Sequence, residues 1–125
     1  MRRVRNQAAF TLMEIMIIVA IIGMLAALAM PGFIKVRKQS QARRILNDAR
    51  MIDTAIDAWA MEKGRADGDA IDMAEVATYA KGGTLPTVDL LGNPFLIGTV
   101  GTNQVRISTT TKSALTGVPI DWGPY

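Results

Sequence analysis

The sequence has 125 residues, the size of one domain, with 14 lysines and arginines against 11 aspartates and glutamates. It contains no cysteine and no histidine, which excludes Cys/His zinc sites, cysteine nucleophiles and Ser-His pairs. Three of the basic residues are Arg2, Arg3 and Arg5, so the rest of the chain is neutral. The basic balance therefore indicates a targeting segment rather than a nucleic-acid surface.

The segment from Ile15 to Ile34 contains no charged residue. At about 1.5 Å per residue, a helix of this length spans roughly 30 Å, the thickness of the hydrocarbon core of a bilayer. Glu14 lies at the start of this run, and a carboxylate within a membrane costs on the order of 3 kcal/mol. We therefore expect a transmembrane helix over 10–34 in which Glu14 has a function.

The residues around Glu14 resemble the N-terminus of type IV pilin and type II secretion pseudopilin precursors. In that family a short basic leader precedes a Phe-Thr-Leu motif, a glutamate and an apolar helix; here Phe10-Thr11-Leu12 and Glu14 match. Ala9 stands where the family nearly always has glycine before the cleaved bond. The resemblance implies that residues 1–9 are a leader, which prepilin peptidase removes before N-methylating Phe10.

Cleavage at that bond would create an ammonium group on Phe10, one helical turn from Glu14. Because a lone buried charge is costly, each group would be the partner of the other, and the resemblance implies that they pair between subunits during assembly. The alternative is that Glu14 only reaches the cytoplasmic interface. The family also has a helix stretch that loosens on assembly, here between Gly23 and Pro31-Gly32, although both residue types are tolerated in ordinary membrane helices.

The apolar run is followed by basic residues and then by an amphipathic helix. The bend expected at Pro31-Gly32 lies within one helix from about Phe10 to Lys63, where Gly64 supplies a stop. The basic residues suit a membrane boundary; they are Lys35, Arg37, Lys38, Arg43 and Arg44. Apolar residues then recur at intervals of three and four; they are Ala42, Ile45, Ala49, Ile52, Ile56 and Trp59.

Residues 64–125 are expected to cover this apolar stripe and to form a small globular head. The fold would be α+β, with residues 35–125 comprising the outer part of the helix and this head. Asp72 and Glu75 have capping-box spacing and predict a short helix to Ala80. The β-branched runs 95–100 and 104–109 predict a hairpin whose Val105 and Ile107 face the stripe.

The C-terminal residues are expected to add to this head. Residues 110–116 could form one helical turn. The apolar tail 122–125 should dock on the head rather than extend into solvent.

Two binding alternatives come from charged residues. The acids Asp67, Asp69, Asp72 and Glu75 suggest calcium, which some pseudopilins bind, but they lack the central glycine and distal glutamate of a helix-loop-helix calcium loop. Turn and cap roles explain them, and we expect no cofactor. The basic cluster 35–44 could bind DNA, as in competence pilins, but without interleaved aromatic residues a membrane-boundary or intersubunit role is favoured.

We therefore expect a structural subunit, not an enzyme, of a periplasmic pseudopilus or type IV pilus-like filament. A type II secretion pseudopilin is favoured over a pilus or competence pilin, because pseudopilins often lack a disulfide and Leu91–Phe95 is similar to their Trp-Gly-Asn-Pro-Tyr region. The resemblance implies a single-pass protein of the bacterial inner membrane with its C-terminus in the periplasm. Its partners would be prepilin peptidase/N-methyltransferase, other pilin-like subunits, the inner-membrane assembly platform and lipid.

The alternative is a single-pass tethered or secreted small binding domain whose leader matches by coincidence. Ala27-Leu28-Ala29 is an acceptable signal-peptidase site, although the apolar run is long for a signal peptide and contains Glu14 at its edge. The mature N-terminus separates these classes. It would be Phe10 for a pilin, Met30 for a secreted domain and Met1 for a plain anchor.

Overall fold

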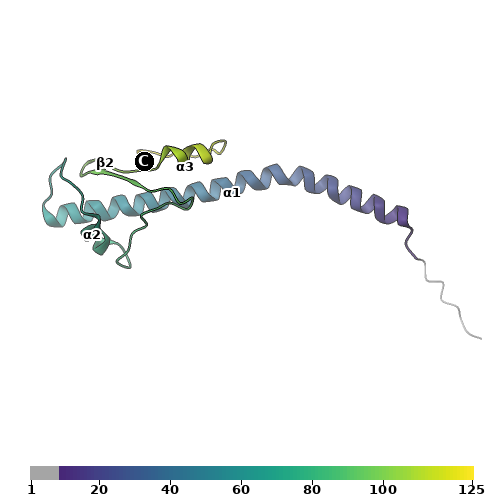
Figure 1. Cartoon of the computed structure of the whole chain (residues 1–125), viewed down its shortest axis with the longest axis horizontal. Coiled ribbons are helices and arrows are strands. Elements are labelled where there is room, and N and C mark those ends of the chain that lie inside the picture. The colour runs from purple at the N-terminus through teal and green to yellow at the C-terminus, as the bar shows by residue number, and fades with distance from the viewer. Residues whose placement is uncertain (1–8) are drawn as a thin grey trace, which may run out of the picture. The chain divides into compact units, whose positions relative to one another are not determined.

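The structure, a computed structural model, describes residues 9–125. Its elements are α1 (Leu12–Lys63), α2 (Met73–Val76), the 3-10 turn η1 (Ala77–Tyr79), β1 (Leu96–Thr99), β2 (Thr102–Arg106) and α3 (Thr109–Ala114) (Figure 1). The expected α+β fold, a long helix with a small two-stranded sheet, is confirmed. The chain divides into two compact units, one ending at Ile34 and one covering 35–125.

The first unit contains the apolar part of α1. Its large apolar side chains from Ile15 to Ile34 are all exposed; the exposed fraction is 47% for Ile15 and 53% for Ile34. The most apolar 18-residue window of α1 has a mean hydropathy of 2.6 and no buried residue, so by length and composition this helix can cross a membrane. The helix continues through Pro31 and Gly32, and the bend expected there stays a prediction.

In the second unit the expected stripe on α1 forms the core. Ile45, Ile52 and Trp59 are fully buried, as are the other three predicted members of the stripe. Leu46, Ala55 and Ala60 widen this face, so it covers more of the helix circumference than the predicted line of residues. Burial of four large side chains at 1.5–3 kcal/mol each makes this face the main source of stability in the head.

The hairpin that covers the stripe is shorter than its sequence suggested. β1 and β2 are antiparallel, with Ile97 opposite Val105 and an irregularity at Gly98. A Cβ atom on Gly98 would lie 2.2 Å from the carbonyl oxygen of Asn103, so the strands can approach this closely only at glycine.

The expected end of the second strand at Thr109 is wrong. Ser108 instead accepts a hydrogen bond from Thr110 N at 3.2 Å and caps α3, so the chain leaves the sheet after Arg106. The expected three-residue connection also shortens, because Thr102 already pairs with Thr99 across the turn. Gly101 takes the left-handed conformation, with φ of 79°, that this tight turn requires.

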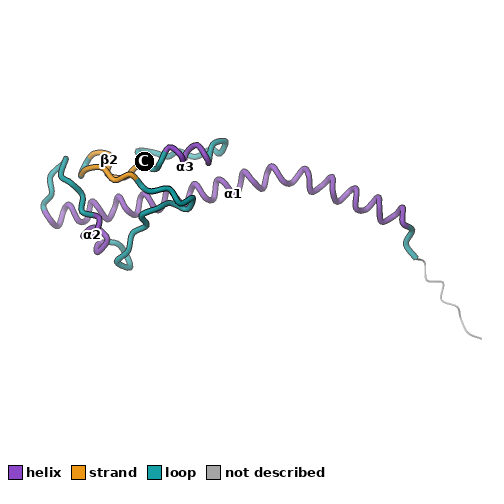
Figure 2. The backbone as a smooth tube through the Cα atoms, viewed as in Figure 1, coloured by secondary structure: helices purple, strands orange, loops and turns teal. Residues whose placement is uncertain are grey.

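The remaining segments wrap the outer half of α1 mostly as loops (Figure 2). Val105 and Ile107 are buried in one cluster with the α1 stripe, which confirms the predicted inward face of the second strand. The C-terminal tail also docks as expected: Trp122 and Tyr125 pack against this cluster. The Tyr125 hydroxyl donates to Asp53 Oδ2 on α1 at 3.0 Å, which ties the end of the chain to the helix.

Candidate functional site

The first candidate site is the N-terminal end of α1. Ala9 and Phe10 precede the helix, which begins at Leu12 rather than at Phe10 as expected. Phe10 is 78% exposed, so the bond expected to be cleaved lies in non-helical, accessible backbone. The leader residues Arg2, Arg3 and Arg5 lie outside the described residues.

The helix begins two residues later than expected because Thr11 and Glu14 cap it. Thr11 N donates to Glu14 Oε2 at 2.8 Å, and Glu14 N donates to Thr11 Oγ1 at 3.3 Å. These two bonds form a reciprocal capping box, whose Thr-x-x-Glu spacing could have been read from the sequence. Losing a cap of this kind costs about 1 kcal/mol, so Thr11 is a site residue that the sequence interpretation missed.

The capping box gives Glu14 a partner within its own chain. In the precursor, the carboxylate accepts from the Thr11 amide and also lies at the positive end of the helix dipole, where an anion is favoured. Glu14 and Phe10 are both exposed, so a second chain can reach either group. The pairing of Glu14 with a Phe10 ammonium between subunits remains a proposal, and it would compete with the cap.

The glycines expected to loosen α1 are not required by packing within a single chain. A Cβ atom added at Gly23 or Gly32 would meet no atom within 4 Å. Pro31 has no amide hydrogen to donate, so the helix lacks one of its internal hydrogen bonds there. A requirement for glycine at these positions would therefore come from contacts outside the single chain.

The second candidate surface is the basic segment 35–44 of α1. All of its cations are exposed except Lys38, which is half-buried. Among the side-chain hydrogen bonds within residues 9–125, none uses one of these five cations. The charges of this segment are therefore available to an external partner.

Glu75 illustrates how tertiary contacts replace a local one. Asp72 caps α2 as expected, accepting from Ala74 N at 2.9 Å and from Glu75 N at 3.4 Å. The Glu75 carboxylate accepts from the indole N–H of Trp59 at 2.8 Å, where a reciprocal capping bond was expected. The Trp59 ring has a second polar contact: the guanidinium of Arg65 lies 5.2 Å from the ring centre, within cation–π range.

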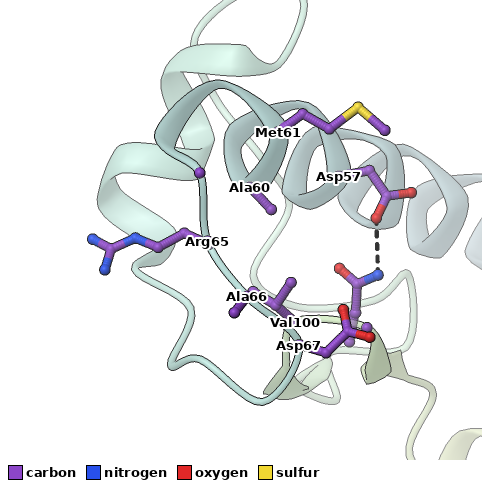
Figure 3. Close-up of a pocket in the computed structure, with 10 residues that line it drawn as sticks. Asp57, Ala60, Met61, Arg65, Ala66, Asp67 and Val100 are labelled. Atoms are coloured by element: carbon purple, nitrogen blue, oxygen red, sulfur yellow. Dashed lines mark hydrogen bonds between the residues drawn. The ribbon is translucent and has the colours of Figure 1, made fainter.

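A hollow of about 480 Å³ lies between the end of α1 and the β1–β2 turn (Figure 3). Asp57 and Asp67 both line it, whereas the guanidinium of Arg65 is directed away from them. Gln104 Nε2 donates to Asp57 Oδ1 at 2.9 Å, and its buried Oε1 has no partner in the described chain. Within residues 9–125 no group of three His, Cys, Asp or Glu side chains is placed to hold a metal ion.

A buried polar network that the sequence interpretation missed holds the Gly92–Pro94 turn. Asp89 is only 6% exposed and accepts from Leu91 N at 2.8 Å and Asn93 N at 3.0 Å. The Thr111 hydroxyl donates to the same carboxylate, and Asn93 Nδ2 donates to Thr111 at 2.9 Å. The aspartate three residues before Gly92 was the available signal. The network fixes the turn onto α3, a structural role.

Two titratable groups of the head share the Tyr125 contact. Burial raises the pKa of Asp53, while the hydrogen bond from Tyr125 lowers it and the charge of Asp57 raises it. Burial also raises the pKa of Tyr125, and Asp53 adds to this through the hydrogen bond and its charge. Both groups are partly buried, and both line a hollow of about 180 Å³ beside β2.

Comparison with known proteins agrees with these features. The family "Prokaryotic N-terminal methylation motif" matches residues 4–30. Fimbrial protein Q of Moraxella bovis is 30% identical over 122 residues, which cover 91% of this chain and 77% of that protein. The type IV major pilin protein PilA of Myxococcus xanthus is 45% identical over 61 residues, 49% of this chain and 27% of that protein.

A third relative comes from a secretion system. Type II secretion system core protein G of Klebsiella michiganensis is 31% identical over 65 residues, 52% of this chain and 45% of that protein. No solved structure gives a significant match.

An uncovered apolar helix that begins at a methylation motif and carries a small α+β head defines a pilin-like protein. Its match to fimbrial protein Q extends over nearly the whole chain and therefore includes the head as well as the motif. The chain belongs to the family of type IV pilins and type II secretion pseudopilins.

Proposed function

We propose that this chain is a structural subunit of a periplasmic pseudopilus, made as a precursor and anchored in the bacterial inner membrane. Prepilin peptidase would cleave between Ala9 and Phe10 and N-methylate Phe10. The match of residues 4–30 to a methylation motif and the accessible, non-helical backbone at Ala9-Phe10 support this processing step. Residues 10–34 would then hold the subunit in the membrane, with the head in the periplasm.

The observation that carries the assembly role is the contrast between the two parts of α1. From residue 42 onward its apolar face is covered by the head, and up to Ile34 its apolar side chains are exposed all round. Lipid covers such a surface in the membrane, and outside it the apolar helices of other subunits can cover it. Copies of this chain and other pilin-like subunits supply such helices in a filament, with an inner-membrane platform adding each subunit.

The type II secretion pseudopilus is favoured by the small head and by the Gly92–Pro94 turn, which Asp89 and Thr111 hold in place. The relation to core protein G of Klebsiella michiganensis supports the same class. A type IV pilus is the second candidate, because the match to fimbrial protein Q of Moraxella bovis covers more of this chain. We expect no cofactor for either role, because Asp69 and Asp72 already accept local turn and cap hydrogen bonds.

Mass spectrometry of the membrane protein from its own host tests the processing step. The expected mature N-terminus is N-methylated Phe10. Ala9→Leu should leave only precursor because the peptidase site needs a very small residue, whereas the control Ala9→Gly should be cleaved at least as well as the parent. A mature chain that begins at Met30 would contradict the proposal.

Deletion of the gene separates the two filament classes. Loss of proteins from the culture medium, with surface filaments intact, is expected for a pseudopilus subunit. Loss of filaments that can be sheared from the cell surface, with secretion intact, would favour the pilus. A complementing copy with wild-type sequence controls for effects on neighbouring genes.

A further inference from the structure

The basic and acidic residues of the second unit lie in separate segments of the sequence. Residues 35–44 contain five basic and no acidic side chains, whereas residues 45–80 contain eight acidic and three basic ones. The two segments therefore carry formal charges of opposite sign and equal size. The hydrogen bonds of five of these acids come from uncharged donors; the acids are Asp53, Asp57, Asp69, Asp72 and Glu75.

Four of these groups share the exposed side of α1. Arg43 and Arg44 belong to the basic segment, and Asp57 and Glu62 belong to the acidic one. All four are exposed and lie off the buried stripe. Asp57 lies about 21 Å further along the helix than Arg43, and Glu62 about 27 Å further than Arg44. These separations exceed the Debye length of about 8 Å at physiological ionic strength, so the two groups attract each other little within one chain.

Lipid head groups do not account for Arg43 and Arg44. The apolar run ends at Ile34, and Arg43 follows about 14 Å further along α1. The head-group layer is only about 5–7 Å thick on each side of the hydrocarbon core. Lys35, Arg37 and Lys38 are near enough to bind lipid, but the arginine pair lies beyond this layer.

We propose that Arg43 and Arg44 of one copy dock on the Asp57 and Glu62 surface of a second copy of this chain. The second copy would be shifted by about 21–27 Å along the helix axis. The inference rests on the proposed filament role, since membrane anchoring at the same end makes neighbouring copies parallel. Unshifted parallel copies would bring the basic segments together, and this like-charge contact disfavours side-by-side pairs. The shifted contact uses different surfaces on the two partners, so it can repeat without closing and builds a filament.

Cysteine cross-linking of the full chain in host cells that make the whole assembly machinery tests the shift, because the sequence has no cysteine of its own. Asn47 and Met61 are exposed on the same side of α1 and are separated by about 21 Å of helix. Differently tagged copies that carry Asn47→Cys and Met61→Cys should form a mixed disulfide dimer. Copies that carry Asn47→Cys alone should not cross-link to one another, and abundant dimers of that kind would overturn the shift.

Charge reversal tests the contact itself. Arg43→Glu with Arg44→Glu in the Asn47→Cys copy should reduce the mixed dimer at least tenfold. Combining that copy with a Met61→Cys copy carrying Asp57→Arg and Glu62→Arg should restore it to within about twofold. The control pair Lys81→Glu with Arg106→Glu makes the same charge change on exposed residues elsewhere and should leave the dimer unchanged.

A separate cross-link distinguishes this inference from the proposed function. Cysteines on the 15–30 helix of the parent should give a ladder of multimers if the chain assembles at all. A ladder that persists while the charge reversals have no effect would overturn the docking surface alone, and the absence of any ladder would overturn both proposals. A loss of the mixed dimer that the copy carrying Asp57→Arg and Glu62→Arg fails to restore would overturn the inference.

Discussion

Replacement of Trp59 by alanine tests the central packing claim for the head. The indole is fully buried in a core that also includes Val76 of α2 and Val105 of β2, so its removal would leave a large cavity. Truncation of a buried Trp costs about 3–5 kcal/mol. The lost hydrogen bond adds little, because Glu75 is exposed and water can replace the indole N–H. We therefore expect a loss of about 3–4 kcal/mol in the free energy of unfolding.

The assay is urea unfolding of a protein that contains residues 35–125, which form a compact unit. This unit should be soluble without residues 1–34 because its α1 stripe is covered. A domain of this size has a stability of roughly 5–10 kcal/mol and a urea slope of about 1–1.5 kcal/mol per M. Trp59→Ala should thus lower the urea midpoint by about 2–4 M, or leave the domain unfolded without urea.

Two matched variants make the result specific. Trp59→Phe keeps one ring in the core but leaves a smaller cavity than Trp59→Ala, and it should lose about 1–2 kcal/mol. Met61→Ala lies two residues away at 85% exposure and should change stability by less than about 0.5 kcal/mol. Equal midpoints for Trp59→Ala and Met61→Ala would refute the proposed core.

Three further outcomes are expected. Glu14→Ala should insert into the membrane and be cleaved like the parent but accumulate as a processed monomer, because a broken buried charge pair costs about 3–5 kcal/mol. Cross-links through cysteines on the 15–30 helix measure this assembly. A ladder of multimers like that of the parent would mean that Glu14 is only a helix cap. Gly98→Ala should destabilise the head by more than about 2 kcal/mol in urea, since its Cβ would overlap the Asn103 backbone, whereas Gly64→Ala, with open space around it but φ of 63°, should cost only about 1 kcal/mol. The pKa of Asp53 is raised in the folded protein, so its contribution to stability is fully present below the unfolded pKa and is lost as pH rises through the folded pKa. Asp53→Asn should therefore unfold at a higher urea concentration than the parent at pH 7 and lose this advantage at acidic pH. A difference between parent and variant that does not change with pH would contradict this.

Local patterning was sufficient for the features that depend on neighbours along the chain. The spacing of Ile45, Ile52 and Trp59 predicted the buried face, since residues three and four apart share one side of a helix. The uncharged run from Ile15 predicted an uncovered helix in the same way. The Asp72 cap was also predicted, because its acceptor and donors lie within three residues.

Only the tertiary structure decided the contacts between distant segments. The Glu75 carboxylate bonds Trp59 because the fold brings α2 against α1, and no local pattern distinguishes this from a capping box. The second strand ends at Arg106 because Ser108 caps α3, whose Thr111 is buried, although residues 107–109 have strand-like side chains. Many segments have two acceptable local structures of similar energy, and burial against a distant partner selects one of them.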